Sequence, residues 1–203
     1  MPELPEVETV RRGLEPVLVG AKLTRVEQRR ANLRFPFPKD FVKQLKGQRI
    51  DALNRRAKYL IAEISNGQSL VMHLGMSGRF TITPAPSAKK KKGSQPKPGK
   101  FAHDIITDAK HDHVLFETEV GASVTYNDPR RFGFMLLIPE AERHAHKLFH
   151  KLGVEPLGNE LTATYLAKCA LGKKVDLKAF LMDQRIVAGL GNIYVAEALY
   201  RAN

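Results

Sequence analysis

The first part of the chain carries an apolar pattern with helical spacing. Apolar side chains recur three or four positions apart, at Leu4, Val7, Val10, Leu14, Val17 and Leu18, which predicts an amphipathic helix that buries one face. Glu3 and Glu6 are three positions apart and therefore share a face away from that apolar stripe. Pro16 and Gly20 predict that the helix ends between residues 15 and 20.

The middle of the chain changes to short apolar runs that are separated by turn residues. The runs KYLIAEIS and QSLVMHLG flank Asn66-Gly67, a pair typical of tight β-hairpin turns. The stretch from HDHVLFETEV through VTYNDPRRFGFMLLI predicts further antiparallel strands, with a turn near Gly121. Because strands and helices do not alternate here, the pattern favours a two-sheet antiparallel sandwich or a barrel.

A helical pattern returns near His144 and continues to the last residue. It runs through HKLFHKLG, TATYLAKCALG and LKAFLMDQRIVAGLGNIYVAEALYRAN. We therefore expect an α+β chain: a domain of residues 1–143 with the N-terminal helix and a two-sheet antiparallel β-sandwich, then a helical domain of residues 144–203. The final pattern stops at Asn203 without a helix-capping signal, so we expect a truncated chain with more helix beyond it.

The charge balance indicates a polyanionic partner. The chain has 33 Lys and Arg against 21 Asp and Glu, a net charge of +12, and nucleic acid is the first partner that such an excess suggests. Residues 84–100 contain six lysines, four prolines and no acid, which predicts a flexible surface insertion. Without those six lysines the charge of the remaining chain is still +6.

The sequence argues against a membrane protein and a disulfide-stabilised one. It has no apolar run of about 18 residues and no cationic segment followed by an apolar one. Cys169 is the only cysteine, which excludes an intramolecular disulfide, argues against a thiolate zinc site and predicts a cytoplasmic location. His111-Asp112-His113 offers two histidines without further spaced ligands, so we expect no metal site there.

The opening MPELPEVE places a proline directly behind Met1 and crowds it with acids. One interpretation is ordinary helix initiation, because proline suits the first turn and acids there oppose the positive end of the helix dipole. The other is chemical, since removal of Met1 would expose the secondary amine of Pro2. An α-amino group has a pKa of about 8, against about 10.4 for a lysine, and so offers more neutral nucleophile at pH 7.

Four stretches carry a resemblance to a known family. They are PELPEVE at the start, RRAKYL at residues 55–60, HLGMSG at 73–78 with NDPRRFG at 127–133, and GLGNIYVAEAL at 189–199. Together they resemble the formamidopyrimidine-DNA glycosylase family, bacterial base-excision enzymes for oxidised purines, over essentially the whole chain apart from residues 84–100. The sister endonuclease VIII family typically opens PEGPE, so Leu4 favours the purine branch. The resemblance implies a helix–two-turn–helix motif, incomplete here, in the helical domain.

The resemblance implies a catalytic set of Pro2, Glu3, Glu6 and Lys58. Pro2 would attack C1′ of the damaged nucleotide and form an iminium Schiff base, which drives β- and δ-elimination at the sugar. Glu3 would transfer protons during ring opening and base loss, and Glu6 would be a supporting carboxylate. Lys58 would donate a proton in the elimination and contact a flanking phosphate. This chemistry needs no metal or organic cofactor.

The resemblance also implies a DNA-binding set. Met76, Arg130 and Phe132 would fill the gap that an extruded nucleotide leaves in the base stack, with Arg130 facing the orphaned base. The residues that would hold backbone phosphate are His73, His111, Arg131, Lys173 and Asn192. The glycines of GLGN let a phosphate approach the start of the last helix, and Asn192 can also cap that helix.

The sequence therefore predicts a base-excision repair DNA glycosylase with AP lyase activity, acting as a monomer on double-stranded DNA that contains 8-oxoguanine, formamidopyrimidines or abasic sites. The family ends in a four-cysteine zinc finger, whose ligands and structural zinc this chain lacks. Three alternatives stay open. They are an endonuclease VIII-like glycosylase for oxidised pyrimidines, a catalytically silent DNA-binding module, and a basic structural or ribosome-associated protein.

Overall fold

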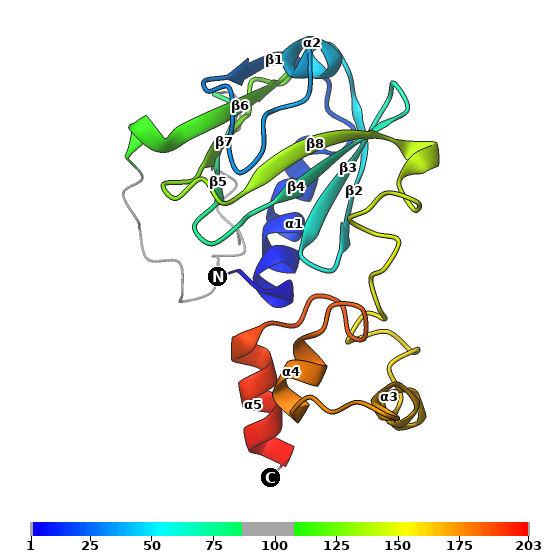
Figure 1. Cartoon of the computed structure of the whole chain (residues 1–203). Coiled ribbons are helices and arrows are strands. Elements are labelled where there is room, and N and C mark those ends of the chain that lie inside the picture. Colours follow the sequence, from blue (N-terminus) through cyan, green and yellow to red (C-terminus); the bar gives the residue numbers. More distant parts are fainter. Residues whose placement is uncertain (1, 87–107, 203) are drawn as a thin grey trace.

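The computed structural model describes residues 2–86 and 108–202, which form a β-sandwich with an N-terminal helix and a group of short helices at one end of it (Figure 1). The helices are α1 (Leu4–Leu18), α2 (Phe41–Leu45), α3 (Ala163–Ala170), α4 (Leu177–Met182) and α5 (Asn192–Ala202), with 3₁₀ turns at Ala109–His111 and Glu140–Glu142. The strands are β1 (Leu23–Gln28), β2 (Ile50–Arg56), β3 (Tyr59–Ile64), β4 (Gln68–His73), β5 (Arg79–Thr83), β6 (Asp112–Thr118), β7 (Ser123–Asn127) and β8 (Phe134–Pro139). The predicted α+β architecture is confirmed.

Helix α1 buries the apolar stripe that its spacing predicts. Its buried side chains are Leu4, Val7, Leu14 and Leu18, and Val10 and Val17 pack against the same core. Pro5 stands in the first turn, where its missing N–H has no helical partner to lose. The helix ends at Leu18, inside the predicted interval.

The strands form two four-stranded antiparallel sheets. One has the order β1-β6-β7-β5 and the other β2-β3-β4-β8. The predicted hairpin at Asn66-Gly67 joins β3 to β4, and Gly67 adopts a positive φ of 79° in its turn. A single apolar core receives side chains from α1, α2 and both sheets.

Two loops cross between the sheets at the same end of the sandwich. The first, residues 74–78, runs from β4 of one sheet to β5 of the other, and the second, residues 128–133, runs back from β7 to β8. Their ends are fixed by register, because His73 pairs with Phe134 and Arg79 pairs with Asn127. We call these segments the Met76 loop and the Arg130 loop.

The helical part has a small core of its own. Phe180, Ile186 and Val187 are buried there, packed against side chains that include Tyr165 and Leu166 of α3. Side-chain oxygens cap two of its helices: Thr162 accepts a hydrogen bond from the Tyr165 N–H, and Asp176 accepts one from the Ala179 N–H. The α3 and α5 segments confirm the helical pattern of this part of the chain.

One predicted helix is wrong. Residues 146–153, the run HKLFHKLG, form consecutive turns with bonds such as Phe149 N–H to His146 O. Contacts with distant parts of the chain override the helical pattern, because the carbonyls of Leu152 and Gly153 accept hydrogen bonds from Arg56. The division of the chain at residue 143 stays a prediction, and residues 87–100 of the predicted insertion lie outside the described residues.

Candidate active site

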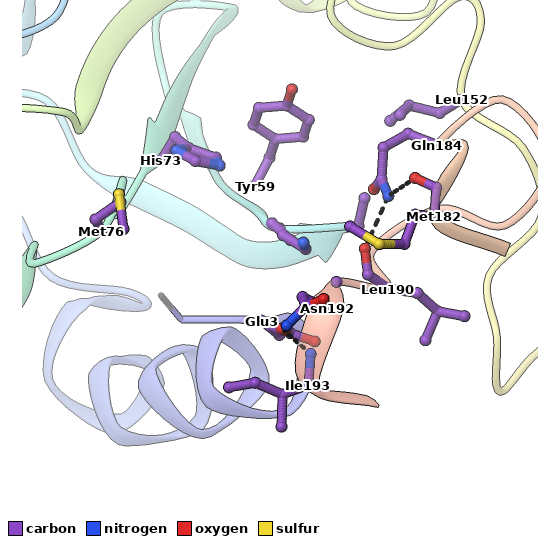
Figure 2. Close-up of a pocket in the computed structure, with 13 residues that line it drawn as sticks. Glu3, Tyr59, His73, Met76, Leu152, Met182, Gln184, Leu190, Asn192 and Ile193 are labelled. Carbon is purple, nitrogen blue, oxygen red and sulfur yellow. Dashed lines mark hydrogen bonds between the residues drawn. The ribbon is translucent and has the colours of Figure 1, made fainter. Parts of the chain in front are cut away.

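A cavity of about 540 Å³ opens between the sandwich and the helical part (Figure 2). It is bounded by the start of α1, the β2–β3 turn, the end of β4 and the loop that leads into α5. Five residues that the sequence nominates line it: Glu3, Lys58, His73, Met76 and Asn192. Segments far apart in the chain therefore bring acid, amine, imidazole and amide groups to one space.

Glu3 directly precedes α1, and its buried carboxylate contacts the start of α5, a helix that is distant in the sequence. Its side chain is only 2% exposed, and its two oxygens accept hydrogen bonds from the backbone N–H groups of Ile193 (3.0 Å) and Tyr194 (3.3 Å) in the first turn of α5. These two bonds fix the carboxylate at the N-terminus of α5, where the helix dipole has its positive end. Asn192 is the first helical residue of α5 rather than its cap, and Glu3 supplies the capping oxygens instead.

Glu6 joins the same arrangement from the first turn of α1. One oxygen accepts the Glu3 backbone N–H at 3.0 Å, and the other accepts the Tyr194 hydroxyl at 3.1 Å. Glu6 is thus hydrogen-bonded on both sides, to its own helix and to α5. The residue before Glu3 is Pro2, so the chain start is held beside the cavity by these two carboxylates.

Lys58 enters the cavity from the tight turn between β2 and β3. Burial lowers the pKa of its ammonium below the usual value, while the charges of Glu3 and Glu6 oppose that effect. Ala57, the residue before it, has a left-handed φ of 51°. Such a conformation is costly for a residue other than glycine and has to be imposed by neighbours.

Glu155, in the segment between the sandwich and α3, holds this turn. Its carboxylate accepts hydrogen bonds from the Ala57 backbone N–H (2.7 Å), Arg55 (2.8 Å) and Arg56 (2.7 Å). Burial alone would raise the pKa of Glu155, but these three donors lower it below its usual value. Arg55 continues the network to Glu8 of α1 at 3.0 Å.

Glu8 is the far end of that network. Although burial raises its pKa, hydrogen bonds from Arg11, Arg12 and Arg55 lower it to about 2. The sequence alone indicates only that Glu8 is an acid near the start of a helix. The structure gives it a further part, because it ties α1 to the strand that leads to Lys58.

His73 brings an imidazole to the cavity from the end of β4. Its ring stacks on Phe134 at 5.3 Å between centroids and lies 5.3 Å from the ring of Tyr59. Its Nδ1 accepts the Gly75 backbone N–H at 3.0 Å, so the neutral ring carries its proton on Nε2. Burial, together with the charges of Lys58 and Arg34, lowers the pKa of His73 to about 4, and the side chain is a neutral donor at pH 7.

The two crossing loops expose the three residues that the sequence groups as gap fillers. Met76 is 41% exposed and Phe132 is 45% exposed. The guanidinium of Arg130 stacks over the Phe132 ring at 4.8 Å from its centroid. Arg131, next to them, has a left-handed φ of 59°. Both apolar side chains are therefore accessible on the surface of the two loops.

Two further nominated residues, like Arg130, Arg131 and Phe132, do not line the cavity. His111 ends a 3₁₀ turn and contacts the Arg130 loop through its backbone, where its carbonyl accepts the Asp128 N–H at 3.1 Å. Lys173 is exposed in the connection between α3 and α4. Neither side chain lines the cavity.

Several residues that line the cavity are not predicted from the sequence. Gln184 is the clearest: its amide donates to the carbonyls of Met182 (3.0 Å) and Leu190 (2.8 Å) and accepts from the Gly189 N–H (2.8 Å), which fixes the loop before α5. Tyr59, Leu152 and Ile193 also line the cavity. Only Tyr59 carries a signal in the sequence, since it directly follows the nominated Lys58.

The described residues, 2–86 and 108–202, offer no cluster of three or more His, Cys, Asp and Glu side chains that could hold a metal ion. Cys169 is the one cysteine of the sequence. Within the same residues, no helix has the length and apolarity needed to cross a membrane.

Two family models match the chain. The formamidopyrimidine-DNA glycosylase N-terminal domain matches residues 1–135, and the formamidopyrimidine-DNA glycosylase H2TH domain matches residues 152–203. The matches define the class of protein: DNA glycosylases in which a sandwich domain precedes a helix–two-turn–helix domain.

Curated relatives and solved structures agree with that class. The chain is 56% identical over 202 residues to the formamidopyrimidine-DNA glycosylase of Beijerinckia indica and 59% identical over 206 residues to that of Chelativorans sp., in each case over 100% of this chain and over 66% and 67% of the relative. Lactococcus lactis formamidopyrimidine-DNA glycosylase, non-covalently bound to DNA with an AP site, superposes with a TM-score of 0.75 and 32% identity over 98% of this chain and 69% of that one. The same enzyme with DNA containing N7-benzyl-Fapy-dG gives a TM-score of 0.76 and 33% identity over 98% and 66%.

The chain belongs to the formamidopyrimidine-DNA glycosylase family. It spans about two thirds of the length of the curated relatives that it matches.

Proposed function

We propose that this chain is a base-excision DNA glycosylase and AP lyase whose nucleophile is the secondary amine of Pro2. The observation that carries the proposal is the cavity in which Glu3, Lys58 and the first turn of α5 meet beside the chain start. Acids close to an amine nucleophile and a partly desolvated lysine are the groups that such a reaction needs. The family relationship supports the same assignment.

The reaction begins after removal of Met1, which frees the Pro2 nitrogen. Its lone pair forms a bond to C1′ of the damaged nucleotide, and the glycosidic bond breaks with its electron pair on the departing base, which takes up a proton. The attached nitrogen then loses its proton, its lone pair breaks the C1′–O4′ bond while O4′ takes up a proton, and the opened sugar is a cationic iminium. Loss of a 2′-proton then expels the 3′-phosphate by β-elimination, and a second, δ-elimination breaks the C5′–O bond and expels the 5′-phosphate. Water then hydrolyses the iminium, which releases the sugar remnant from Pro2.

Glu3 is the proton-transfer group in this proposal. Its hydrogen bonds to the first turn of α5 hold its carboxylate beside the chain start, where it accepts a proton and returns it during ring opening or base loss. Glu6, bonded to the Glu3 N–H and the Tyr194 hydroxyl, positions the chain start. Lys58 has a lowered pKa because it is buried, which makes its ammonium a better proton donor to the leaving phosphate.

The surface around the cavity is proposed to bind duplex DNA with one nucleotide extruded. Met76, Arg130 and Phe132 enter the vacated position in the stack, since an apolar wedge and a planar cation replace the lost stacking. Backbone phosphates are held by His73 through its Nε2–H, by Asn192 at the start of α5, and by His111, Arg131 and Lys173 around the site.

The proposed substrates are 8-oxoguanine, formamidopyrimidines and abasic sites in double-stranded DNA, and we expect a monomer in the cytoplasm. The Lactococcus lactis enzyme has been solved with AP-site DNA and, as a mutant, with Fapy-dG DNA, which supports the assignment by relationship. The chemistry attributed to Pro2, Glu3 and Lys58 uses no metal or organic cofactor.

Reductive trapping tests the proposal directly. The chain, with Met1 removed, is incubated with abasic-site DNA and borohydride, which converts an iminium into a stable protein–DNA adduct. We expect an adduct with the wild-type chain, a weaker one with Pro2→Gly, and none when an extra residue precedes Pro2. An adduct that survives the N-terminal extension places the nucleophile elsewhere and overturns the assignment.

A second pair of outcomes separates an enzyme from a binding module. Mass spectrometry of the chain establishes whether Met1 has been removed before the assay. A chain with a free Pro2 amine that binds abasic-site duplex but forms no adduct is a binding module without lyase chemistry. Comparison of matched duplexes with an oxidised purine or an oxidised pyrimidine then distinguishes the proposed branch from the endonuclease VIII-like one.

A further inference from the structure

The Met76 loop and the Arg130 loop are in backbone contact at the end of the sandwich. Gly75 has a positive φ of 62°, and a Cβ on it would collide with the backbone of Phe132 and Gly133. A Cβ on Gly133 would in turn meet the His73 carbonyl at 2.7 Å. The two loops therefore approach so closely that only glycine fits at either contact.

A single hydroxyl joins the two loops beyond that contact. Ser77 of the Met76 loop donates its O–H to the Asp128 Oδ1 at 2.5 Å and accepts the Arg130 backbone N–H at 3.1 Å. Both partners belong to the Arg130 loop. Arg130 itself is exposed, so the contact fixes the backbone of a side chain that otherwise projects into solvent.

Asp128 makes this contact rigid. The residue is 0% exposed, and its second oxygen accepts the Gly133 N–H at 2.8 Å and the Tyr126 hydroxyl at 3.2 Å. Its backbone carbonyl is bonded to His113 Nε2 at 2.8 Å. A buried carboxylate with this many partners is held in one position, and its hydrogen bond to Ser77 fixes the position of the Ser77 hydroxyl in turn.

We infer that Ser77 is a positioning residue that sets how Arg130 faces the base opposite an extruded nucleotide, and hence the preference for that base. The inference rests on the proposed function, in which Arg130 faces the orphaned base. A guanidinium only donates hydrogen bonds. Cytosine presents the adjacent acceptors O2 and N3 to it, whereas adenine presents an acceptor beside a donor, so a fixed guanidinium favours cytosine.

The test compares the affinity of the chain for two duplexes that differ only in the base opposite a tetrahydrofuran abasic analogue, cytosine or adenine. We expect the wild-type chain to prefer cytosine, and Ser77→Ala to reduce the ratio of the two affinities about fivefold, the change expected from one lost neutral hydrogen bond. Ser123→Ala, a serine of β7 outside both loops, serves as the matched control and keeps the wild-type ratio.

A double-mutant cycle shows whether Ser77 acts through Arg130. Arg130→Ala abolishes the preference in this proposal, and adding Ser77→Ala to it then changes nothing further, because the two residues act as one unit. A Ser77→Ala effect of the same size in the Arg130→Ala background overturns the inference, as does an unchanged ratio in Ser77→Ala alone.

Amide hydrogen exchange tests the contact between Ser77 and the Arg130 N–H in the absence of DNA. The Arg130 N–H is bonded to Ser77 Oγ, so its exchange in the wild-type chain is slow and becomes at least tenfold faster in Ser77→Ala, but not in Ser123→Ala. Equal exchange in wild type and Ser77→Ala overturns the inference. A wild-type chain that forms the borohydride adduct but shows no opposite-base preference overturns the inference alone. A chain that forms no adduct contradicts the proposed function, and the exchange result still decides whether Ser77 holds Arg130.

Discussion

Gly191 lies directly against the carboxylate of Glu3. A Cβ built on Gly191 would stand 2.5 Å from the Glu3 Cδ and 2.6 Å from its Oε1, so no side chain fits between α5 and the start of α1. The same carboxylate accepts the Ile193 N–H across a separation of 190 positions in the sequence. The close approach of backbone and carboxylate is what lets a group at the chain start cap the last helix.

The first prediction concerns that contact. Gly191→Ala forces the Glu3 carboxylate away from Ile193 and Tyr194, since a methyl group takes its place. We expect the yield of the borohydride adduct to fall at least tenfold, because a small misplacement of a proton-transfer group has a large effect on rate. The measurement is adduct formation with abasic-site DNA under single-turnover conditions.

Gly13→Ala is the matched control for this substitution. Gly13 lies in α1, and a Cβ added there would meet nothing within 4 Å, so alanine adds helix propensity without a clash. We expect the free energy of unfolding to rise by about 0.5–1 kcal/mol and adduct formation to stay at the wild-type level. Equal adduct yields for both glycine variants would show that the position of the carboxylate has no part in the chemistry.

The second prediction concerns Glu155 and the turn that carries Lys58. Glu155→Gln removes the charge that pairs with Arg55 and Arg56 while keeping the shape of the side chain. We expect the free energy of unfolding to fall by about 2 kcal/mol, as is typical when one partner of a partly buried charge cluster is lost. Urea denaturation measures this change.

The same variant separates positioning from binding. Because Glu155 holds the Ala57 N–H and so the start of Lys58, the rate of strand cleavage at an abasic site should fall more than the affinity for the same duplex. Glu160→Gln, an exposed acid in the same connection, is the control and leaves both quantities unchanged. A loss of affinity as large as the loss of rate contradicts a role in positioning Lys58.

The third prediction is a pH dependence that arises from His73. Its folded-state pKa of about 4 lies below the value of 6.5 expected for an unfolded chain. As the pH falls, the unfolded chain therefore takes up the proton first, and the stability that His73 contributes is lost between about pH 6.5 and pH 4. The expected loss is on the order of 2–3 kcal/mol.

Urea unfolding of the wild-type chain and His73→Gln across that range measures this loss, because the variant lacks the titrating ring. We expect the wild-type chain to lose more stability than His73→Gln as the pH falls from 6.5 to 4. His144→Gln, at an exposed position, follows the wild-type chain. Parallel curves for wild type and His73→Gln would show that the ring takes up its proton equally in both states.

Local patterns predict the elements whose stability is mainly local. The stripe from Leu4 to Leu18 and the Asn66-Gly67 hairpin appear in the structure as the sequence predicts them, because each is set by spacing and by one turn. The run at residues 146–153 has the composition of a helix but not its conformation. Its carbonyls are bonded to Arg56, a contact that no local pattern encodes.

The candidate site shows the same limit. Glu3, Lys58 and Met76 are found from motifs, and they do line one cavity. Glu155 and Gln184 are missed. Glu155 binds the backbone of Ala57, which is distant in the sequence, and Gln184 binds the backbone of Leu190, whose position depends on how the loop folds. Asn192 has a residue type typical of a helix cap, yet Glu3 takes that part, since the fold carries a carboxylate from the chain start to α5.

The network of Arg55, Arg56, Glu8 and Glu155 limits how many cations are available for DNA binding. Both arginines are already neutralised by carboxylates of the same chain, so they displace no condensed counterions when a duplex arrives. The slope of affinity against salt concentration counts only cations that meet phosphate. It will therefore count fewer cations than the 33 Lys and Arg of the chain, and its size will measure how many positive side chains the fold leaves available to the nucleic acid.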